Sequence, residues 1–155
     1  MRLVVVLAFV AALGTLAQAE GTWWLGISLG GTHFLGAFVE YREGEMGVLV
    51  SLGTAVPWRL NDLSLAFQLR RYPAGPSPAP YLGLGGWAFF VRKGASWGWL
   101  ASLDLSAGLQ WGPGGGMGLE LGAILHYFLA VHWEGSTGFN SRTLILPALA
   151  FEWAP

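Results

Sequence analysis

The chain has 155 residues, which is enough for one domain and short for two. Hydrophobic residues make up 54% of it and charged residues only 11%, whereas a typical soluble domain has roughly 25% charged residues. The net charge of −1 and the lack of basic runs argue against nucleic-acid binding, and the absence of cysteine excludes a disulfide scaffold and thiol chemistry. Because so few charges cannot coat a soluble domain, we expect part of the surface to contact something other than water.

Residues 1–19 have the pattern of a secretory signal peptide. Arg2 precedes the apolar run LVVVLAFVAAL, and Ala17-Gln18-Ala19 follows as an A-x-A cleavage site. A membrane-anchoring helix needs about 20 apolar residues, and this run is too short for one. We therefore predict that 1–19 are removed on export and that 20–155 form a single domain.

The rest of the chain divides into eight apolar runs separated by segments rich in glycine, proline or asparagine. These runs cover 22–30, 33–42, 46–56, 63–72, 81–92, 97–111, 117–133 and 142–153. The separating segments include PAGPSPAP at 73–80, GPGGG at 112–116 and EGSTGFNS at 134–141. Such spacing predicts an all-β meander of antiparallel strands rather than a helical bundle.

Bulky apolar side chains alternate with small or polar ones inside these runs. In 97–111, tryptophan, leucine and alanine occupy every second position, and most positions between them hold Gly, Ser, Asp104 or Gln110. In 117–133, leucines alternate in the same way with Glu120, His126 and His132. Because successive side chains of a strand point to opposite faces, we expect Glu120, His126 and His132 to share one face.

Two architectures can bury one apolar face on every strand. A soluble barrel or sandwich turns that face inward, whereas a transmembrane barrel turns it toward lipid and lines a lumen with the other face. The second faces here are rich in glycine and poor in charge, which suits a narrow lumen better than a water-facing surface. We therefore predict an eight-stranded antiparallel up-and-down transmembrane β-barrel. The alternative is a soluble lipocalin-like binder, suggested by Gly21-Thr22-Trp23.

Aromatic residues gather near the predicted strand ends. If the first strand starts at the periplasmic side, the aromatics form two groups at opposite ends of the barrel, as bilayer interfaces favour. The periplasmic group is Trp23, Tyr41, Trp111 and Trp153, and the outer group is Trp58, Trp97, Trp99 and Trp133.

The face opposite the leucines carries a small set of ionisable residues. They are Glu40, Arg70, Asp104, Glu120, His126 and Glu152. Because an unpaired buried charge is costly, we expect Arg70 to pair with Glu40 or Glu120 and to plug the lumen. The alternative is that this pair gates a narrow passive channel for small solutes.

Three stretches carry a family resemblance: YPAGPSPAPYLGLGGWAFFVR, SLDLSAGLQWGPGGGMGLELGAILHYF and LILPALAFEW. Together they cover much of 72–153, which resembles the later strands and turns of the OmpA-like family of small outer-membrane barrels. The resemblance implies an eight-stranded barrel in the outer membrane of a bacterium. It implies little about activity, since such barrels include structural proteins, adhesins, small pores and lipid-modifying enzymes.

The resemblance also suggests how the chain would be inserted. In such families the alternating last strand, with an aromatic near its end, is thought to be read by the outer-membrane insertion machinery. Phe151 and Trp153 match that pattern here. Ala154 and Pro155 follow, whereas an aromatic usually ends the chain, so the signal is displaced by two residues.

The sequence offers little support for catalysis. Lipid-modifying barrel enzymes of this size use a His-x-Ser arrangement, but the residues two positions after the histidines are Leu35, Phe128 and Glu134. GPGGG lacks the Lys-Ser/Thr of a phosphate loop, and the three histidines are too far apart for a metal site. We therefore expect no enzymatic activity, cofactor or metal, the lipid bilayer as the main partner, and a structural or envelope-integrity role. The sequence does not indicate the oligomeric state.

Overall fold

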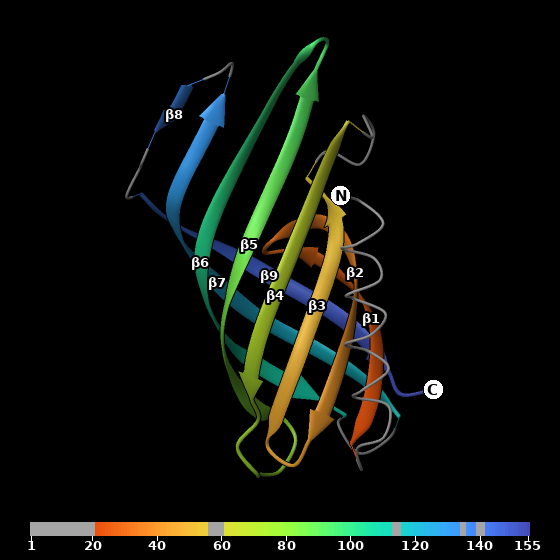
Figure 1. Cartoon of the computed structure of the whole chain (residues 1–155). Coiled ribbons are helices and arrows are strands. Elements are labelled where there is room, and N and C mark those ends of the chain that lie inside the picture. The colour runs from red at the N-terminus through yellow and green to blue at the C-terminus, as the bar shows by residue number, and fades with distance from the viewer. Residues whose placement is uncertain (1–20, 56–60, 113–115, 134–135, 139–141) are drawn as a thin grey trace.

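A computed structural model of the chain describes residues 21–155 except 56–60, 113–115, 134–135 and 139–141 (Figure 1). The predicted signal peptide, 1–19, and Trp58 therefore lie outside the described residues. The strands are β1 (Thr22–Gly30), β2 (His33–Glu43), β3 (Met46–Thr54), β4 (Asp62–Arg71), β5 (Ala79–Lys93), β6 (Ser96–Trp111), β7 (Met117–Trp133), β8 (Ser136–Gly138) and β9 (Thr143–Trp153). Within the described residues, no helix is long and apolar enough to span a membrane.

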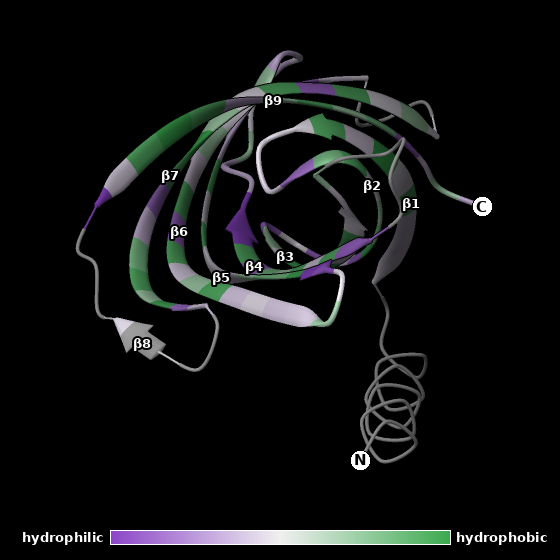
Figure 2. Ribbon diagram, turned by 90° about the horizontal axis from the view of Figure 1, so that it is seen from above, coloured by the Kyte–Doolittle hydropathy of each residue, from purple (hydrophilic) through white to green (hydrophobic). Residues whose placement is uncertain are grey.

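Eight of the strands close into an antiparallel barrel. Each strand from β1 to β7 pairs with the next, β9 pairs with β7, and β9 also pairs with β1 to complete the ring (Figure 2). The three-residue strand β8 pairs with the end of β7 and is additional to the ring. The predicted all-β, eight-stranded antiparallel barrel is therefore confirmed.

The strands differ in detail from the predicted runs, most clearly at the start of β5 and in the presence of β8. The segment 73–80 was expected to be a connection, yet Ala79 and Pro80 already pair with Gln110 and Leu109 of β6. Proline is tolerated at the start of a strand, where few ladder hydrogen bonds are lost. Strand β8 was not predicted, because three residues are too few to show an alternation.

Tight turns fix two of the hairpins. Gly44 lies between the paired residues Glu43 and Met46, and Gly94 lies between Lys93 and Ser96. Both glycines have a positive φ, 58° for Gly44 and 62° for Gly94. This left-handed conformation is what short hairpin turns require, and glycine adopts it without steric cost.

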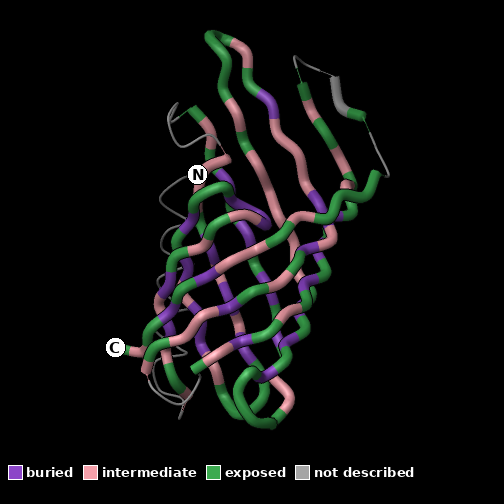
Figure 3. The backbone as a smooth tube through the Cα atoms, turned by 180° about the vertical axis from the view of Figure 1, so that it is seen from behind, coloured by how far each residue is buried: buried purple, intermediate pink, exposed green. Residues whose placement is uncertain are grey.

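The barrel exposes apolar side chains and buries polar ones. Exposed and buried residues alternate along the strands (Figure 3). The exposed outer face carries Leu65, Phe67, Leu69, Leu82, Leu84, Leu103, Leu105, Leu121, Ile145 and Phe151, among others. The buried inner face carries Glu40, Ser64, Gln68, Arg70, Asp104, Gln110, Glu120, His126 and Glu152, among others. A small apolar layer of Phe38, Leu49 and Ala150 lies among these polar groups.

Strands β5, β6 and β7 are the longest and extend past the others at one end of the barrel (Figure 1). We call this the tall end; it holds the β5–β6 turn at Gly94. The opposite end, where β1 begins at Thr22 and β9 ends at Trp153, is the terminal end.

A β-bulge in β7 changes the face of its last residues. Ala101 pairs with Ala130 but Ser102 pairs with Phe128, so Leu129 is an extra residue on β7. Beyond it, His132 pairs with Trp99, and its ring lies 6.0 Å from that of Trp99 in a stacked arrangement. The prediction that His132 faces the lumen was wrong, because strict alternation along one strand assumes an uninterrupted register.

Candidate functional site in the barrel lumen

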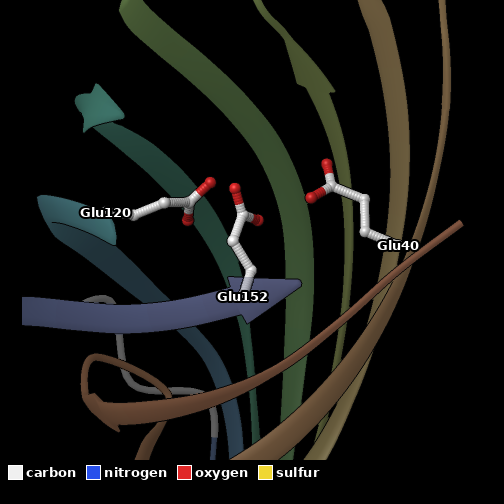
Figure 4. Close-up of side chains that lie close together, drawn as sticks. All are labelled: Glu40, Glu120 and Glu152. Atoms are coloured by element: carbon white, nitrogen blue, oxygen red, sulfur yellow. The ribbon is translucent and has the colours of Figure 1, made fainter. Parts of the chain in front are cut away.

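Three carboxylates converge in the lumen near the terminal end. Glu40 comes from β2, Glu120 from β7 and Glu152 from β9, and their side chains point toward one another (Figure 4). All three residues are at least 98% buried. One oxygen from each lies within 4.8 Å of the others. Three such groups cannot stay charged in so small a volume without cations between them.

Arg42 supplies the central cation. Its Nη2 lies 2.6 Å from Glu40, 2.5 Å from Glu152 and 3.4 Å from Glu120. The guanidinium also lies between two aromatic rings, 4.7 Å from the centre of Trp24 and 4.3 Å from that of Tyr72. A single nitrogen therefore bridges strands β2, β7 and β9 across the lumen.

Arg70 supplies the second cation, from β4. Its Nη1 lies 2.8 Å from Glu120 and 3.8 Å from Glu40, so it reaches both of the partners that the sequence suggested. Tyr72 donates a 2.7 Å hydrogen bond to Glu40, and Gln110 donates one to Glu152. We call Glu40, Arg42, Arg70, Tyr72, Gln110, Glu120 and Glu152 the terminal network.

Carboxylates at this separation could in principle hold a metal ion. Arg42 Nη2 already contacts all three carboxylates, so a guanidinium nitrogen occupies the place that a metal would take. Hydrogen bonding between planar guanidinium and carboxylate groups satisfies the same charges. The geometry is therefore that of an internal ion-pair network rather than of a metal centre.

A small cavity lies beside the terminal network. It measures about 30 Å³ and is lined by Ser28, Ser51, Gln68, Arg70 and Glu120, together with apolar side chains such as Ile124. Ser28 Oγ is buried there without a hydrogen-bond partner among the described residues. A cavity of this size and polarity accommodates roughly one water molecule.

A second polar layer lies nearer the tall end. His33 places its two ring nitrogens 2.7 Å from Ser64 Oγ and 2.8 Å from Ser51 Oγ. Ser64 donates a hydrogen bond to the carbonyl of Thr32 and accepts one from Trp87. All these polar groups are satisfied from neighbouring strands, so this layer fastens β2, β3, β4 and β5 together.

The second layer also contains an acid–histidine pair. Asp104 and His126 face each other across β6 and β7, with Asp104 Oδ1 2.8 Å from His126 Nδ1. Ser102 donates a hydrogen bond to the same carboxylate oxygen, and the Trp87 ring lies 4.8 Å from the imidazole. Both members were predicted lumen residues, but their pairing depends on a register that the sequence does not reveal.

His33 contacts two serines that are distant from it in the sequence. No His-x-Ser arrangement exists in the sequence, yet Ser51 and Ser64 reach His33 from β3 and β4. Ser64 is fully buried and its hydroxyl proton is engaged by Thr32. A serine nucleophile must reach both its base and a substrate, and Ser64 has no accessible surface with which to meet one.

The six ionisable residues listed for the lumen did not include every member of the terminal network. Glu40, Arg70, Asp104, Glu120, His126 and Glu152 are all buried on the inner face. The most connected group, Arg42, was not predicted, although it lies two positions after Glu40 and so shares its face. Applying the same period to Arg70 would have found Tyr72.

The predicted aromatic groups divide between the two ends. Trp23, Tyr41, Trp111 and Trp153 lie at strand ends of the terminal end, where the rings of Trp23 and Tyr41 are 5.2 Å apart. Trp97 and Trp99 lie on the outer face of the tall end beside His132. Trp133 also lies at the tall end, but the bulge pairs it with Gly98 and turns it to the inner face.

One exposed ion pair lies outside the lumen, at the terminal end. Arg71 Nη2 is 3.1 Å from Glu45 in the β2–β3 turn. Hydrogen bonds from Arg71 and from the Ala74 backbone hold the pKa of Glu45 below its usual value. Because water screens such a pair, it contributes far less than the buried terminal network.

Comparison of the chain with protein-family models, with curated proteins and with solved structures gives no match. Membership of the OmpA-like family therefore stays a prediction.

Proposed function

We propose that the protein is a small outer-membrane β-barrel of the OmpA-like kind, with a structural or envelope-integrity role and a closed, polar lumen. The observation that carries this proposal is the inverted distribution of side chains. Large apolar residues cover the outside of the barrel, and charged residues fill its inside.

The outer face supports a lipid environment. Leu82, Leu84, Leu105 and Ile145 each expose more than half of their surface. Covering one such side chain with an apolar medium stabilises a protein by about 1.5–3 kcal/mol when the burial is complete. A water-soluble barrel would leave this gain unused on nearly every strand, whereas a bilayer supplies it. Aromatic residues at both ends suit the two interfaces of a bilayer.

The interior supports a closed barrel rather than a pore. Arg42 joins β2 to β9 and Arg70 joins β4 to β7 inside the lumen, and the cavity beside them has room for roughly one water molecule. A passive channel needs a continuous water-filled path, which this network interrupts. The same packing favours a structural role over a catalytic one, because His33 and His126 are buried away from any substrate.

Cell fractionation tests the membrane placement. The full chain, expressed in a Gram-negative host, is expected in the outer-membrane fraction and should stay there through washes with high salt and alkaline carbonate. Recovery in the periplasmic supernatant would contradict the proposal and would favour the soluble, lipocalin-like alternative. A periplasmic maltose-binding protein and a resident outer-membrane porin in the same cells serve as the two controls.

A further inference from the structure

The outer face of the tall end carries a compact aromatic and basic surface. Phe90 and Arg92 of β5 pair with Trp99 and Trp97 of β6, and Trp99 pairs in turn with His132 of β7. The His132 ring lies 5.1 Å from Trp97 and 6.0 Å from Trp99. We call these five residues the tall-end patch.

The patch is positively charged. Arg92 and the next residue, Lys93, are exposed, and neither forms an ion pair with a carboxylate of the described residues. Arg92 uses only its Nε, which donates to the carbonyl of Gly94. Asp62 is the strand partner of Val91, the residue before Arg92. Its carboxylate accepts hydrogen bonds from Thr54 and Ala55 and forms no ion pair with Arg92. The remaining guanidinium N–H groups of Arg92 can therefore bind an external anion.

An apolar groove runs below the patch on the same outer wall. It has a volume of about 780 Å³, and its outward-facing lining includes Leu52, Leu65, Phe67, Gly86 and Ala88. Ala88 is two residues from Phe90 and four from Arg92 on β5, which corresponds to about 13 Å from Ala88 to Arg92 along the strand. The groove is therefore placed within the apolar belt, and the cations lie at its upper edge.

We propose that the groove and the tall-end patch together bind one phosphate-bearing lipid. Its phosphate pairs with Arg92, its interfacial region packs against Trp97 and Trp99, and an acyl chain lies over Gly86 and Ala88. Charge complementarity selects an anionic headgroup over a zwitterionic one, because no described carboxylate neutralises Arg92 or Lys93. The inference rests on the membrane placement proposed above.

Native mass spectrometry of the protein, folded in a zwitterionic detergent, tests this site. The probes are phosphatidylglycerol and phosphatidylcholine with identical acyl chains, and glycerol 3-phosphate as a headgroup without chains. We expect phosphatidylglycerol to bind more tightly than phosphatidylcholine, and glycerol 3-phosphate not to compete. Arg92→Gln should weaken phosphatidylglycerol binding about fivefold, the effect of one basic residue near an anionic headgroup.

Two further variants separate headgroup from chain. Gly86→Leu fills the groove, and its Cβ would meet only the Ser102 carbonyl oxygen, at 3.4 Å, so the strand can accept it. This variant should weaken both lipids equally, whereas Arg92→Gln should weaken phosphatidylglycerol more than phosphatidylcholine. Arg71→Gln removes an exposed arginine at the terminal end and should change neither.

Equal binding of the two lipids by the unsubstituted protein would overturn the inference, as would an Arg92→Gln variant that binds like the parent. Competition by glycerol 3-phosphate would also overturn the inference, because it would indicate a soluble phosphate ligand. Lipid-free dimers that Gly86→Leu abolishes would overturn it too, because they would indicate that a second copy of the chain occupies the groove. A protein that stays in membranes but shows no lipid preference disproves only this site. Recovery in the soluble fraction disproves the proposed function itself.

Discussion

At the scale of single residues, Arg42 decides how the interior is neutralised. Its side chain is only 10% exposed, and its Nη2 contacts Glu40, Glu120 and Glu152. Removing one partner of a buried ion pair leaves the others uncompensated, and this costs more than the pair contributes by forming. The terminal network should therefore respond far more strongly to loss of Arg42 than to loss of an exposed arginine.

Arg42→Met tests that expectation. Three carboxylates would then share the single cation Arg70, and we expect the free energy of unfolding to fall by about 3–5 kcal/mol. Urea unfolding in lipid vesicles, followed by tryptophan fluorescence, measures the change. Arg71→Met is the matched control, since Arg71 forms only an exposed pair with Glu45 and its loss should leave the midpoint nearly unchanged. Equal midpoints for the two variants would contradict the role assigned to Arg42.

At the scale of strands, glycines decide how closely the inner face can pack. Gly108 of β6 and Gly122 of β7 are paired, and the Tyr81 ring lies over both. A Cβ on Gly108 would approach the Gly122 Cα to 2.7 Å and the Leu121 carbonyl oxygen to 2.5 Å. These are backbone atoms, which cannot move away without shifting β7. Glycine is thus required by close approach at this pair.

Gly108→Ala is expected to destabilise the barrel by about 1–3 kcal/mol, as overpacking of a tight interior does. The matched control is Gly86→Ala on β5, whose Cβ would meet the Ser102 carbonyl oxygen at 3.4 Å and face the outside. That substitution should have little effect on stability. Thermal unfolding of both variants, followed by circular dichroism, distinguishes them; similar losses for both would argue against the packing described for β6 and β7.

At the scale of the whole molecule, closure of the ring converts a set of amphipathic strands into a barrel without exposed edges among its eight long strands. The interior then has to be filled, because a lumen of this size encloses side chains rather than a wide channel. The terminal network and the His33 and His126 contacts supply that filling from both ends of the lumen.

This filling predicts that the protein does not conduct ions. In planar lipid bilayers the unsubstituted barrel should give no conductance steps. The double variant Arg42→Ala/Glu152→Ala removes opposite charges together and shortens two side chains of the terminal network, so it should give small steps if it still folds. Unchanged circular dichroism is the control for folding. Steps from the unsubstituted protein that disappear in Arg70→Ala would instead favour a gated channel.

The sequence by itself determined the number of long strands, their positions and the existence of one apolar and one polar face. These follow from local geometry, since a strand repeats every two residues and glycine or proline ends it. The same period placed Glu40, Arg70 and Glu120 on the inner face, and would have placed Arg42 there had it been applied to every charged residue.

Only the tertiary structure decided which of these residues meet. The contact of Arg42 with Glu152 joins residues 110 positions apart, and that of His33 with Ser64 joins residues 31 positions apart. The first contact depends on closure of β9 against β1, and the second on the registers of β3 with β2 and β4. The bulge at Leu129 likewise moved His132 to the outer face. Register results from pairing and packing between strands, so alternation within one strand could not reveal it.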